Sequence, residues 1–425
     1  MRVAAPIAGW AATRAVLLLC VFKVLTPSGP DVTSDVSVIY QGWAQVLGTG
    51  TFPMDDVTWQ YPPAAALPVL APRLLPFLGY APAFFVLACA ADAAVLALFL
   101  YAGRRPGKRL AGAWVWVAGV PLLGPTAYAR YDLMVTAVAV AALFAAARHP
   151  RVAGALIAFG ALLKVWPALL LWGAARGRRA RAIWGAALAG VVVLAVLLVA
   201  AAPGALAFLS FQRDRGTEVE SLGALVFHVA RHFGWPGEVL LNYGSVEYVG
   251  PYVGVVSGAA LALTGAAFGW LLLWRLRARA FPPTVLADAS FAAVLLFTTT
   301  SRVISPQYMV WLVGLAAVCV TARSGRQGLP AVLVLAATGV TFLEFPIWFS
   351  HVVEGDWLGI ALLAVRNGLL VAASLIVCRR LWRACGGVRP VPEPATVARQ
   401  YQARPAFEDD ASGVYRVPES PAARP

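Results

Sequence analysis

The first feature of this 425-residue chain that could carry chemistry is a group of carboxylates near its N-terminus. Between Pro27 and Pro63 there is no lysine or arginine, although the whole chain has a formal net charge of +14. The acidic residues of this segment are Asp31, Asp35, Asp55 and Asp56. A carboxylate held in a fixed position can take a proton from a hydroxyl group as a general base. This acidic segment is therefore the first candidate for an active site.

Asp35 is the best placed of these carboxylates, because apolar side chains follow it at helical spacing. The apolar residues of this pattern are Val36, Ile39, Tyr40, Trp43 and Leu47. The pattern predicts a short amphipathic helix that lies on a membrane surface. An aspartate at a helix start also interacts favourably with the helix dipole, by about 0.3–1 kcal/mol. Asp35 is therefore either a helix cap or a general base at the membrane surface, and the spacing leaves both readings open.

The composition indicates what must position this segment. The chain is 60% hydrophobic and 13% charged, with a mean hydropathy of +0.74. Uncharged runs such as 182–201 and 253–273 reach the roughly 20 residues that cross a bilayer core. In lipid such runs are helical, because their backbone groups need partners within the segment. The expected fold class is all-α, a multi-pass transmembrane helical bundle with about ten full spans. We expect these spans at residues 8–25, 81–102, 110–127, 132–147, 182–201, 253–273, 284–300, 307–322, 329–347 and 358–378.

Short arginine clusters between the expected spans set the orientation, because such clusters favour the cytoplasmic side. This arrangement predicts that both termini are cytoplasmic and that the first outer loop (26–61) and the large outer loop (203–252) are extracytoplasmic. Basic clusters flank residues 152–175 at both ends, so we expect a short helical hairpin there, turning near Lys164 and Pro167.

Domain organisation follows from the same reading. Residues 1–385 form the membrane domain. The polar, proline-rich residues 386–425 are expected to be a disordered cytoplasmic tail.

Two further motifs place polar residues where outer ends of spans are expected. One is Arg130-Tyr131-Asp132, and the other is Ser305-Pro306-Gln307-Tyr308 with Arg302 just before it. A helix N-terminus beside an arginine suits a phosphate group. The same residues equally suit a well-capped helix whose arginine reaches the lipid headgroups, so both readings stay open.

Charged residues inside apolar runs are functional candidates, because they are costly in a membrane. Lys164 is one of them, and it could reach a phosphate or form an internal ion pair. Asp92 and Arg366 both lie near the middle of their spans, and we expect them to pair as a structural strut. The histidines outside the spans show no spacing typical of a closed metal site.

Taken in order, these motifs resemble glycosyltransferase family 87 of the GT-C superfamily, which includes actinobacterial polyprenol-phosphate-mannose-dependent α-mannosyltransferases. The resemblance covers about residues 8–380. Its motifs are Asp35-x4-Tyr40, Gly50-Thr51-Phe52-Pro53, Tyr61-Pro62-Pro63, Arg130-Tyr131-Asp132, Lys164-Val165-Trp166-Pro167, Asp214-Arg215-Gly216, Glu220-Ser221 and Ser305-Pro306-Gln307-Tyr308.

The resemblance implies a membrane enzyme that moves a hexose from a polyprenyl-phosphate donor to a cell-envelope glycolipid or polysaccharide on the extracytoplasmic face. Asp35 would be the base of an inverting single displacement. Candidate residues for the donor phosphate are Arg130, Lys164, Arg215 and Arg302. Candidate substrate-orienting residues are Tyr61, Asp132, Gln307, Tyr308 and His351. This chemistry requires no cofactor or metal, although the acidic loop could hold a divalent cation, and no nucleic acid partner is expected.

Two other classes of protein remain open at this point. A secondary transporter or lipid-linked-sugar flippase would have broken helices and charges near the bilayer midplane. A non-catalytic scaffold for envelope assembly would tolerate loss of Asp35. Polar residues concentrate in the outer loops, and this favours chemistry on a lipid-linked substrate over transport.

Overall fold

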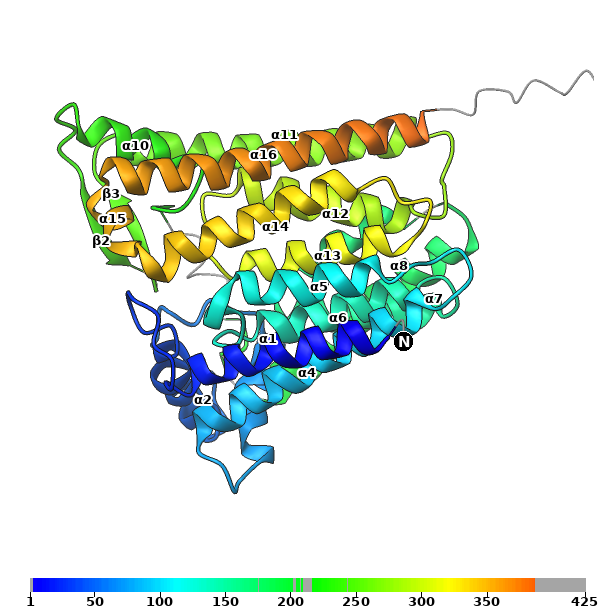
Figure 1. Cartoon of the computed structure of the whole chain (residues 1–425), viewed down its shortest axis with the longest axis horizontal. Helices are drawn as coiled ribbons and strands as arrows, with labels where there is room; N and C mark the ends of the chain where they lie inside the picture. Colours follow the sequence, from blue (N-terminus) through cyan, green and yellow to red (C-terminus); the bar gives the residue numbers. More distant parts are fainter. Residues whose placement is uncertain are drawn as a thin grey trace, which may run out of the picture. The chain divides into compact units, whose positions relative to one another are not determined.

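The structure, a computed structural model, describes residues 3–174, 176–201, 204–206, 208, 216–242 and 244–386. These residues fold as a bundle of long helices that lie side by side, with the irregular segments gathered at the helix ends (Figure 1). The predicted tail, apart from Gly386, lies outside the described residues, and so does Arg215.

Among the residues that the structure describes, six helices are long and apolar enough to cross a membrane. They are α1 (Ala4–Val21), α4 (Tyr80–Gly103), α8 (Arg178–Ala201), α11 (Val253–Arg277), α14 (Gly328–Phe342, continued by a π-helical turn Leu343–Ile347) and α16 (Trp357–Cys385). The shorter apolar helices are α5 (Ala111–Leu122), α6 (Asp132–Ala145), α7 (Pro150–Leu163), α12 (Val285–Thr300) and α13 (Tyr308–Thr321). The structure therefore supports a helical membrane protein and gives six helices of spanning length where the sequence predicts about ten. Pro121 lies near the end of α5, and Pro306 precedes α13, which limits these helices because proline cannot continue a helix hydrogen-bond ladder.

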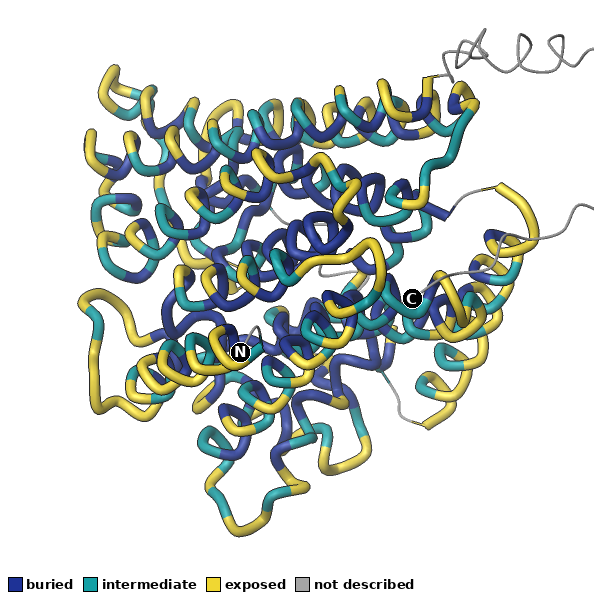
Figure 2. The backbone as a smooth tube through the Cα atoms, turned by 45° about the vertical axis from the view of Figure 1, so that its right-hand side comes forward, coloured by how far each residue is buried: buried dark blue, intermediate teal, exposed yellow. Residues whose placement is uncertain are grey.

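The centre of the bundle is α13, in which every residue from Met309 to Thr321 is buried. By contrast, α8 and α11 lie at the periphery and expose most of their apolar side chains (Figure 2). Such exposed apolar surfaces suit a lipid environment. The site described below is built against the buried centre, where side chains are held by close packing.

The hairpin predicted at residues 152–175 is confirmed in its main features. Helix α7 ends at Leu163, Lys164 has extended backbone angles, and a 3-10 helix runs from Trp166 to Gly173. The two helical segments pack against each other. The break places Lys164 at a turn between helical segments, which is where a charged side chain can reach a cavity.

The helix predicted after Asp35 is present as a π-helical turn, Asp35–Tyr40, that continues into α2 (Gln41–Leu47). Its apolar face is buried within the protein, where Tyr40 contacts Phe84 and Trp43 contacts Trp59. The prediction that this face lies on a membrane surface is therefore wrong. The remaining short helices are α3 (Ala66–Leu70), α10 (Ala224–Arg231) and α15 (Phe349–Glu354), with 3-10 turns at Pro63–Ala65, Ala71–Leu74 and Gly124–Ala127.

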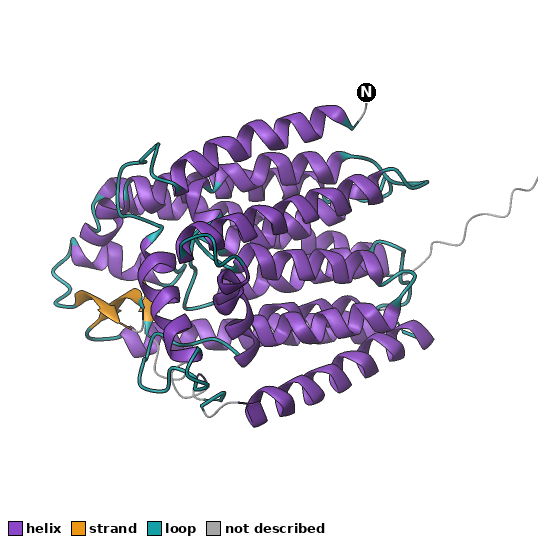
Figure 3. Ribbon diagram, turned by 90° about the horizontal axis from the view of Figure 1, so that it is seen from below, coloured by secondary structure: helices purple, strands orange, loops and turns teal. Residues whose placement is uncertain are grey.

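The large outer loop departs from the all-α prediction, because it contains a small antiparallel sheet of order β1-β3-β2 (Figure 3). The strands are β1 (Thr217–Glu218), β2 (Glu238–Asn242) and β3 (Ser245–Val249). In the register of the sheet, Glu218 of β1 lies opposite Glu247 of β3. This sheet fixes the chain that leads from Glu218 towards the bundle.

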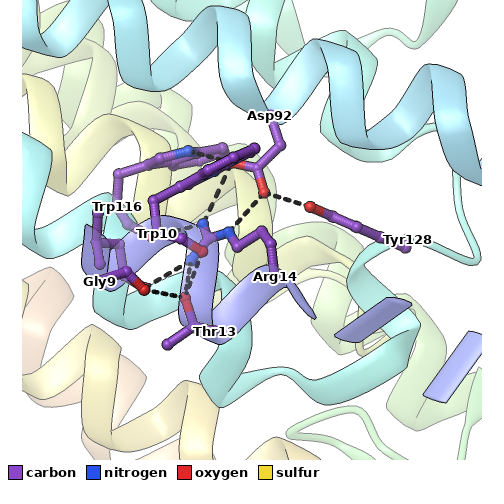
Figure 4. A network of polar contacts seen from close by, with 8 residues as sticks. Gly9, Trp10, Thr13, Arg14, Asp92, Trp116 and Tyr128 are labelled. Atoms are coloured by element: carbon purple, nitrogen blue, oxygen red, sulfur yellow. Dashed lines mark hydrogen bonds and ion pairs between the residues drawn. The ribbon is translucent and has the colours of Figure 1, made fainter. Parts of the chain in front are cut away.

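The expected ion pair between Asp92 and Arg366 is wrong. Asp92 instead accepts hydrogen bonds from Arg14 Nε at 2.7 Å and Tyr128 Oη at 2.8 Å, and from two tryptophans (Figure 4). Arg366 pairs with Glu344 at 2.7 Å. The reason lies in the helix neighbours: α4 packs on α5 and α6, whereas α16 packs on α12 and α14. Depth within the membrane alone does not decide which helices are adjacent.

Candidate active site

A cavity of about 630 Å³ lies at the end of the bundle that carries α2, α15 and β3 (Figure 1). Its walls come from the first outer loop, the start of α6, the α7 turn, the large outer loop and the segment before α13. The polar and charged residues that line it include Asp35, Thr58, Gln60, Tyr61, Arg130, Lys164, Glu218, Glu220, Ser245, Arg302, Ser305, Gln307 and Tyr308. Segments far apart in the sequence thus meet around one space, and residues of α11, α12 and α15 also line it.

Asp35 forms one wall of this cavity and is held by Arg130. Arg130 Nη2 lies 2.7 Å from Asp35 Oδ2, and the Asp35 side chain keeps 32% of its surface exposed. Arg130 Nη1 donates to the carbonyl oxygens of Val32 at 3.1 Å and Ala129 at 2.8 Å. The guanidinium therefore fixes the carboxylate, in an exposed position, relative to the start of α6.

Lys164 forms the next part of the wall. Its Nζ lies 2.8 Å from Asp132 Oδ1, and the same oxygen accepts a 2.7 Å hydrogen bond from Trp311 Nε1. Four aromatic rings surround the ammonium, with ring centres 5.2–5.6 Å from Nζ; they belong to Tyr61, Tyr131, Tyr308 and Trp311. Aromatic faces attract cations at such distances. The cation is therefore positioned by packing as well as by its carboxylate partner.

The segment before α13 completes the cationic side of the cavity. Arg302, Ser305 and Gln307 line the cavity, and Gln307 is the residue that precedes the first turn of α13. Tyr308 stacks on Trp311 with a centroid distance of 4.0 Å. The backbone N–H groups of the first turn of α13 donate to the carbonyl oxygens of Ser305, Pro306 and Gln307 at 3.0–3.2 Å. The group on this side that favours an anion is therefore the arginine side chain.

Two glutamates of the large outer loop line the cavity, although they were not among the predicted site residues. Glu218 and Glu220 are both buried, and Glu218 Oε1 accepts a 3.2 Å hydrogen bond from Ser305 Oγ. Burial raises the pKa of Glu220 well above its usual range, and the charges of Glu344 and Glu218 add to the effect. In the sequence these acids belong to a charge-dense run that is typical of a solvated surface. The Glu220-Ser221 motif of the resemblance indicated a role for Glu220, and no motif included Glu218.

Part of the cavity wall is apolar. The residues of this part include Phe208, Leu241, Leu261, Phe297, Phe345 and Phe349. Leu261 belongs to α11, the helix with the exposed apolar face described above. The cavity therefore combines ionic groups with a surface suited to hydrocarbon.

Arg215 lies outside the described residues, and the other predicted site residues fall into three groups. Those that line the cavity are Asp35, Tyr61, Arg130, Lys164, Arg302, Gln307 and Tyr308. Asp132 lies behind the wall as the partner of Lys164. His351 does not line the cavity, and its Nδ1 contacts Asp356 instead.

The two adjacent acids of the first loop, Asp55 and Asp56, also lie outside the lining of the cavity. Asp56 accepts hydrogen bonds from Trp43 Nε1 and from the backbone and side chain of Thr58. Burial alone would raise the pKa of Asp56, but these hydrogen bonds outweigh burial and lower the pKa. Asp56 therefore holds the loop together. Within the described residues, no group of three or more His, Cys, Asp or Glu side chains is arranged to hold a metal ion.

Comparison with known proteins gives a family. The comparisons with curated proteins and with solved structures found no match. The sequence model of glycosyltransferase family 87 matches residues 59–306, which is more than half of the chain. The matched range contains Arg130, Lys164 and Arg302 and begins after Asp35. On this match, the chain belongs to glycosyltransferase family 87.

Proposed function

We propose that this glycosyltransferase moves a hexose from a polyprenyl-phosphate donor to a lipid-linked glycan acceptor of the cell envelope, and that this hexose is mannose. The observation that supports this most directly is the cavity itself. It places the Asp35 carboxylate in the same space as Lys164 and Arg302 and beside an apolar wall. A sugar donor built on a lipid phosphate has the matching parts: a hydroxylated ring, an anion and a hydrocarbon chain.

The proposed reaction is a single displacement at the anomeric carbon. Asp35 takes the proton of the acceptor hydroxyl while the oxygen of that hydroxyl forms a bond to C1 of the sugar. At the same time the bond between C1 and the donor phosphate oxygen breaks, and both of its electrons stay on the phosphate. Attack from the opposite face inverts the anomeric centre, so a β-linked donor gives an α-linked product. General-base assistance of this kind contributes about 10²–10⁴-fold. The departing phosphate monoester is a stable anion, so the proposed chemistry needs no cofactor.

The cationic residues of the cavity have two different proposed roles. Arg130 binds Asp35 directly, so we assign it to positioning the base. Lys164 and Arg302 are assigned to the donor phosphate, where negative charge develops. Tyr308 and Gln307 orient the substrate beside them. Arg215, which lies outside the described residues, remains a proposed phosphate ligand on the resemblance alone.

We further propose that the cavity faces the extracytoplasmic side and that both termini are cytoplasmic. Helices α5, α6, α12 and α13 would then complete ten crossings with the six long helices. Contacts at the opposite helix ends support this arrangement, because predicted cytoplasmic clusters lie next to one another there. Arg109 N donates to Thr321 O, Arg323 N to Gly107 O, and Arg279 N to Cys385 O.

The test uses the full-length protein in lipid nanodiscs with radiolabelled polyprenyl-phosphate mannose and an envelope-lipid extract as acceptor. Wild type and Asp35→Asn are compared, with Asp31→Asn as the matched control. Asp31 lies in the same loop, and its carboxylate pairs with Lys23 outside the cavity. We expect transfer by wild type and by Asp31→Asn, and a loss of at least 10²-fold in Asp35→Asn. Equal transfer by Asp35→Asn would overturn the assignment of the base. A wild type that moves the labelled lipid across the bilayer without forming product would overturn the transferase.

A further inference from the structure

Glu220 is a buried acid that the proposed reaction does not use. It is 4% exposed and lines the cavity. Its Oε1 atom has no hydrogen-bond partner among the described residues. A buried polar atom without a partner is costly. An atom of this kind at a cavity wall is one that a bound ligand can satisfy.

The backbone around Glu220 is anchored, so its side chain is held in place. The carbonyl oxygen of Glu220 accepts a 2.8 Å hydrogen bond from Arg366 Nη2 and a 3.4 Å hydrogen bond from Asn367 Nδ2, both on α16. Arg366 is itself fully buried and paired with Glu344. This buried pair ties the large outer loop to a long helix and fixes the wall that carries Glu220.

The surroundings of Glu220 favour its neutral form. Arg366 forms its ion pair with Glu344 and bonds only the backbone carbonyl of Glu220. The Glu220 carboxyl group is buried close to the acids Glu344 and Glu218, and both effects disfavour its ionised form. The other charged or titratable groups on the neighbouring segments are Arg302 and His228. His228 is uncharged at neutral pH because burial lowers its pKa to about 4. A neutral carboxyl group both donates and accepts a hydrogen bond, as a sugar hydroxyl does.

Glu220 also lies beside the groups assigned to the donor phosphate. Two residues before it, Glu218 N donates to the carbonyl oxygen of Arg302 at 3.0 Å, and Glu218 Oε1 accepts from Ser305 Oγ at 3.2 Å. In a polyprenyl-phosphate sugar, the ring is one bond from the phosphate. A phosphate held by Arg302 therefore places the ring near this wall.

We propose that Glu220 is a sugar-binding residue, whose carboxyl group exchanges hydrogen bonds with a hydroxyl of the hexose carried by the donor. This proposal rests on the proposed function, because it takes the donor to be a lipid-phosphate sugar. It assigns the outer-loop wall to recognition of the sugar, while Asp35 and the cationic wall carry out its transfer.

The test separates the sugar from the rest of the donor. Equilibrium binding of polyprenyl-phosphate mannose and of sugar-free polyprenyl phosphate is measured on the full-length protein in nanodiscs. Glu220→Ala should lose on the order of tenfold in affinity for the mannose lipid and keep its affinity for the sugar-free lipid. Glu220→Gln, which retains one donor and one acceptor, should stay close to wild type. Glu238→Ala, on the exposed strand β2 of the same sheet, is the control and should bind both lipids as wild type does.

The pH dependence gives a second readout that a purely structural role would not produce. The affinity of wild type for the mannose lipid should fall as rising pH removes the proton of Glu220, and that of Glu220→Gln should not. Equal loss for both lipids in Glu220→Ala, or no loss for either, would overturn the sugar-binding role. Wild type that binds neither lipid would overturn the donor class and this proposal with it. Failure of the Asp35→Asn test alone would leave the binding result standing, so the two failures are distinguishable.

Discussion

The carboxylate of Asp35 and the guanidinium of Arg130 form an ion pair of 2.7 Å that joins the first outer loop to the start of α6. The two residues are 95 positions apart (130 − 35) in the sequence. Arg130 is 9% exposed, and it uses its second terminal nitrogen to hold two backbone carbonyls. The position of the proposed base therefore depends on a cation from another element.

The first prediction concerns this dependence. Arg130→Lys keeps the charge and loses the planar fork that binds Asp35 and the carbonyls together. We expect kcat for sugar transfer to fall about 10²-fold, the loss typical of a small misplacement of a reacting group. Arg231→Lys is the control, because Arg231 also binds a backbone carbonyl, that of Val353, away from the cavity. Steady-state transfer rates check this, and an unchanged kcat in Arg130→Lys would contradict the positioning role.

The second prediction separates folding from function at Lys164. Lys164→Met leaves the Asp132 carboxylate buried without its cation, and breaking such a pair costs about 3–5 kcal/mol. Adding Asp132→Asn removes the unpaired charge and should recover most of the unfolding free energy, while transfer remains lost because the phosphate has lost its cation. Thermal unfolding in detergent and transfer assays are measured on the same preparations. Recovery of transfer in the double variant would exclude Lys164 from phosphate binding.

The sequence predicted the parts of the fold that depend on local pattern. Apolar length placed the long helices, and the basic clusters flanking residues 152–175 indicated the break at Lys164. These signals are carried by residues close together in the chain. The same pattern predicted the helix after Asp35 but gave the wrong partner for its apolar face. A hydrophobic face shows that burial is needed, and it does not say whether lipid or protein covers it.

The candidate site was only partly accessible from sequence, because its geometry depends on contacts between distant segments. Isolated charges in apolar runs identified Lys164, yet the four aromatic rings around it come from three separate segments: the first loop, the residues before α6, and α13. The charge-dense run around Glu220 is typical of a solvated surface, whereas in the structure the sheet and α16 hold Glu220 at the cavity. His351 was a predicted substrate-orienting residue, and the structure places it beside Asp356, outside the lining of the cavity.

The third prediction tests the corrected ion pairs within the bundle. Arg14→Ala and Asp92→Ala remove partners that are both fully buried and 2.7 Å apart. Each should destabilise the protein by about 3–5 kcal/mol, and the double variant should cost much less than the sum. Asp92→Ala combined with Arg366→Ala should be additive within roughly 0.5 kcal/mol, because these residues share no partner. A strong coupling energy between Asp92 and Arg366 in this double-mutant cycle would show that these two residues interact, in contradiction to the structure.

The fourth prediction concerns the start of α16, where Asp356 Oδ1 accepts a hydrogen bond from Gly359 N at 2.9 Å. This bond, with the contact to His351, lowers the pKa of Asp356. A carboxyl group whose pKa is lower in the folded protein than in the unfolded chain stabilises the folded protein at pH values above the unfolded pKa, about 3.9. This stabilisation is lost as the pH falls through the lower pKa of the folded protein. Asp356→Ala should therefore cost about 1 kcal/mol at pH 7 and progressively less below pH of about 4.

The control for this prediction is Glu354→Ala, which removes a nearby carboxylate at the end of α15. Asp356→Ser should keep most of the stability at pH 7, because serine also caps helices, and should lack the acid dependence. Thermal unfolding between pH 3 and pH 8 checks all three variants, roughly across the titration range of a carboxyl group. A stability loss in Asp356→Ala that stays constant down to the lowest pH would show that the ionised carboxylate is not the capping group.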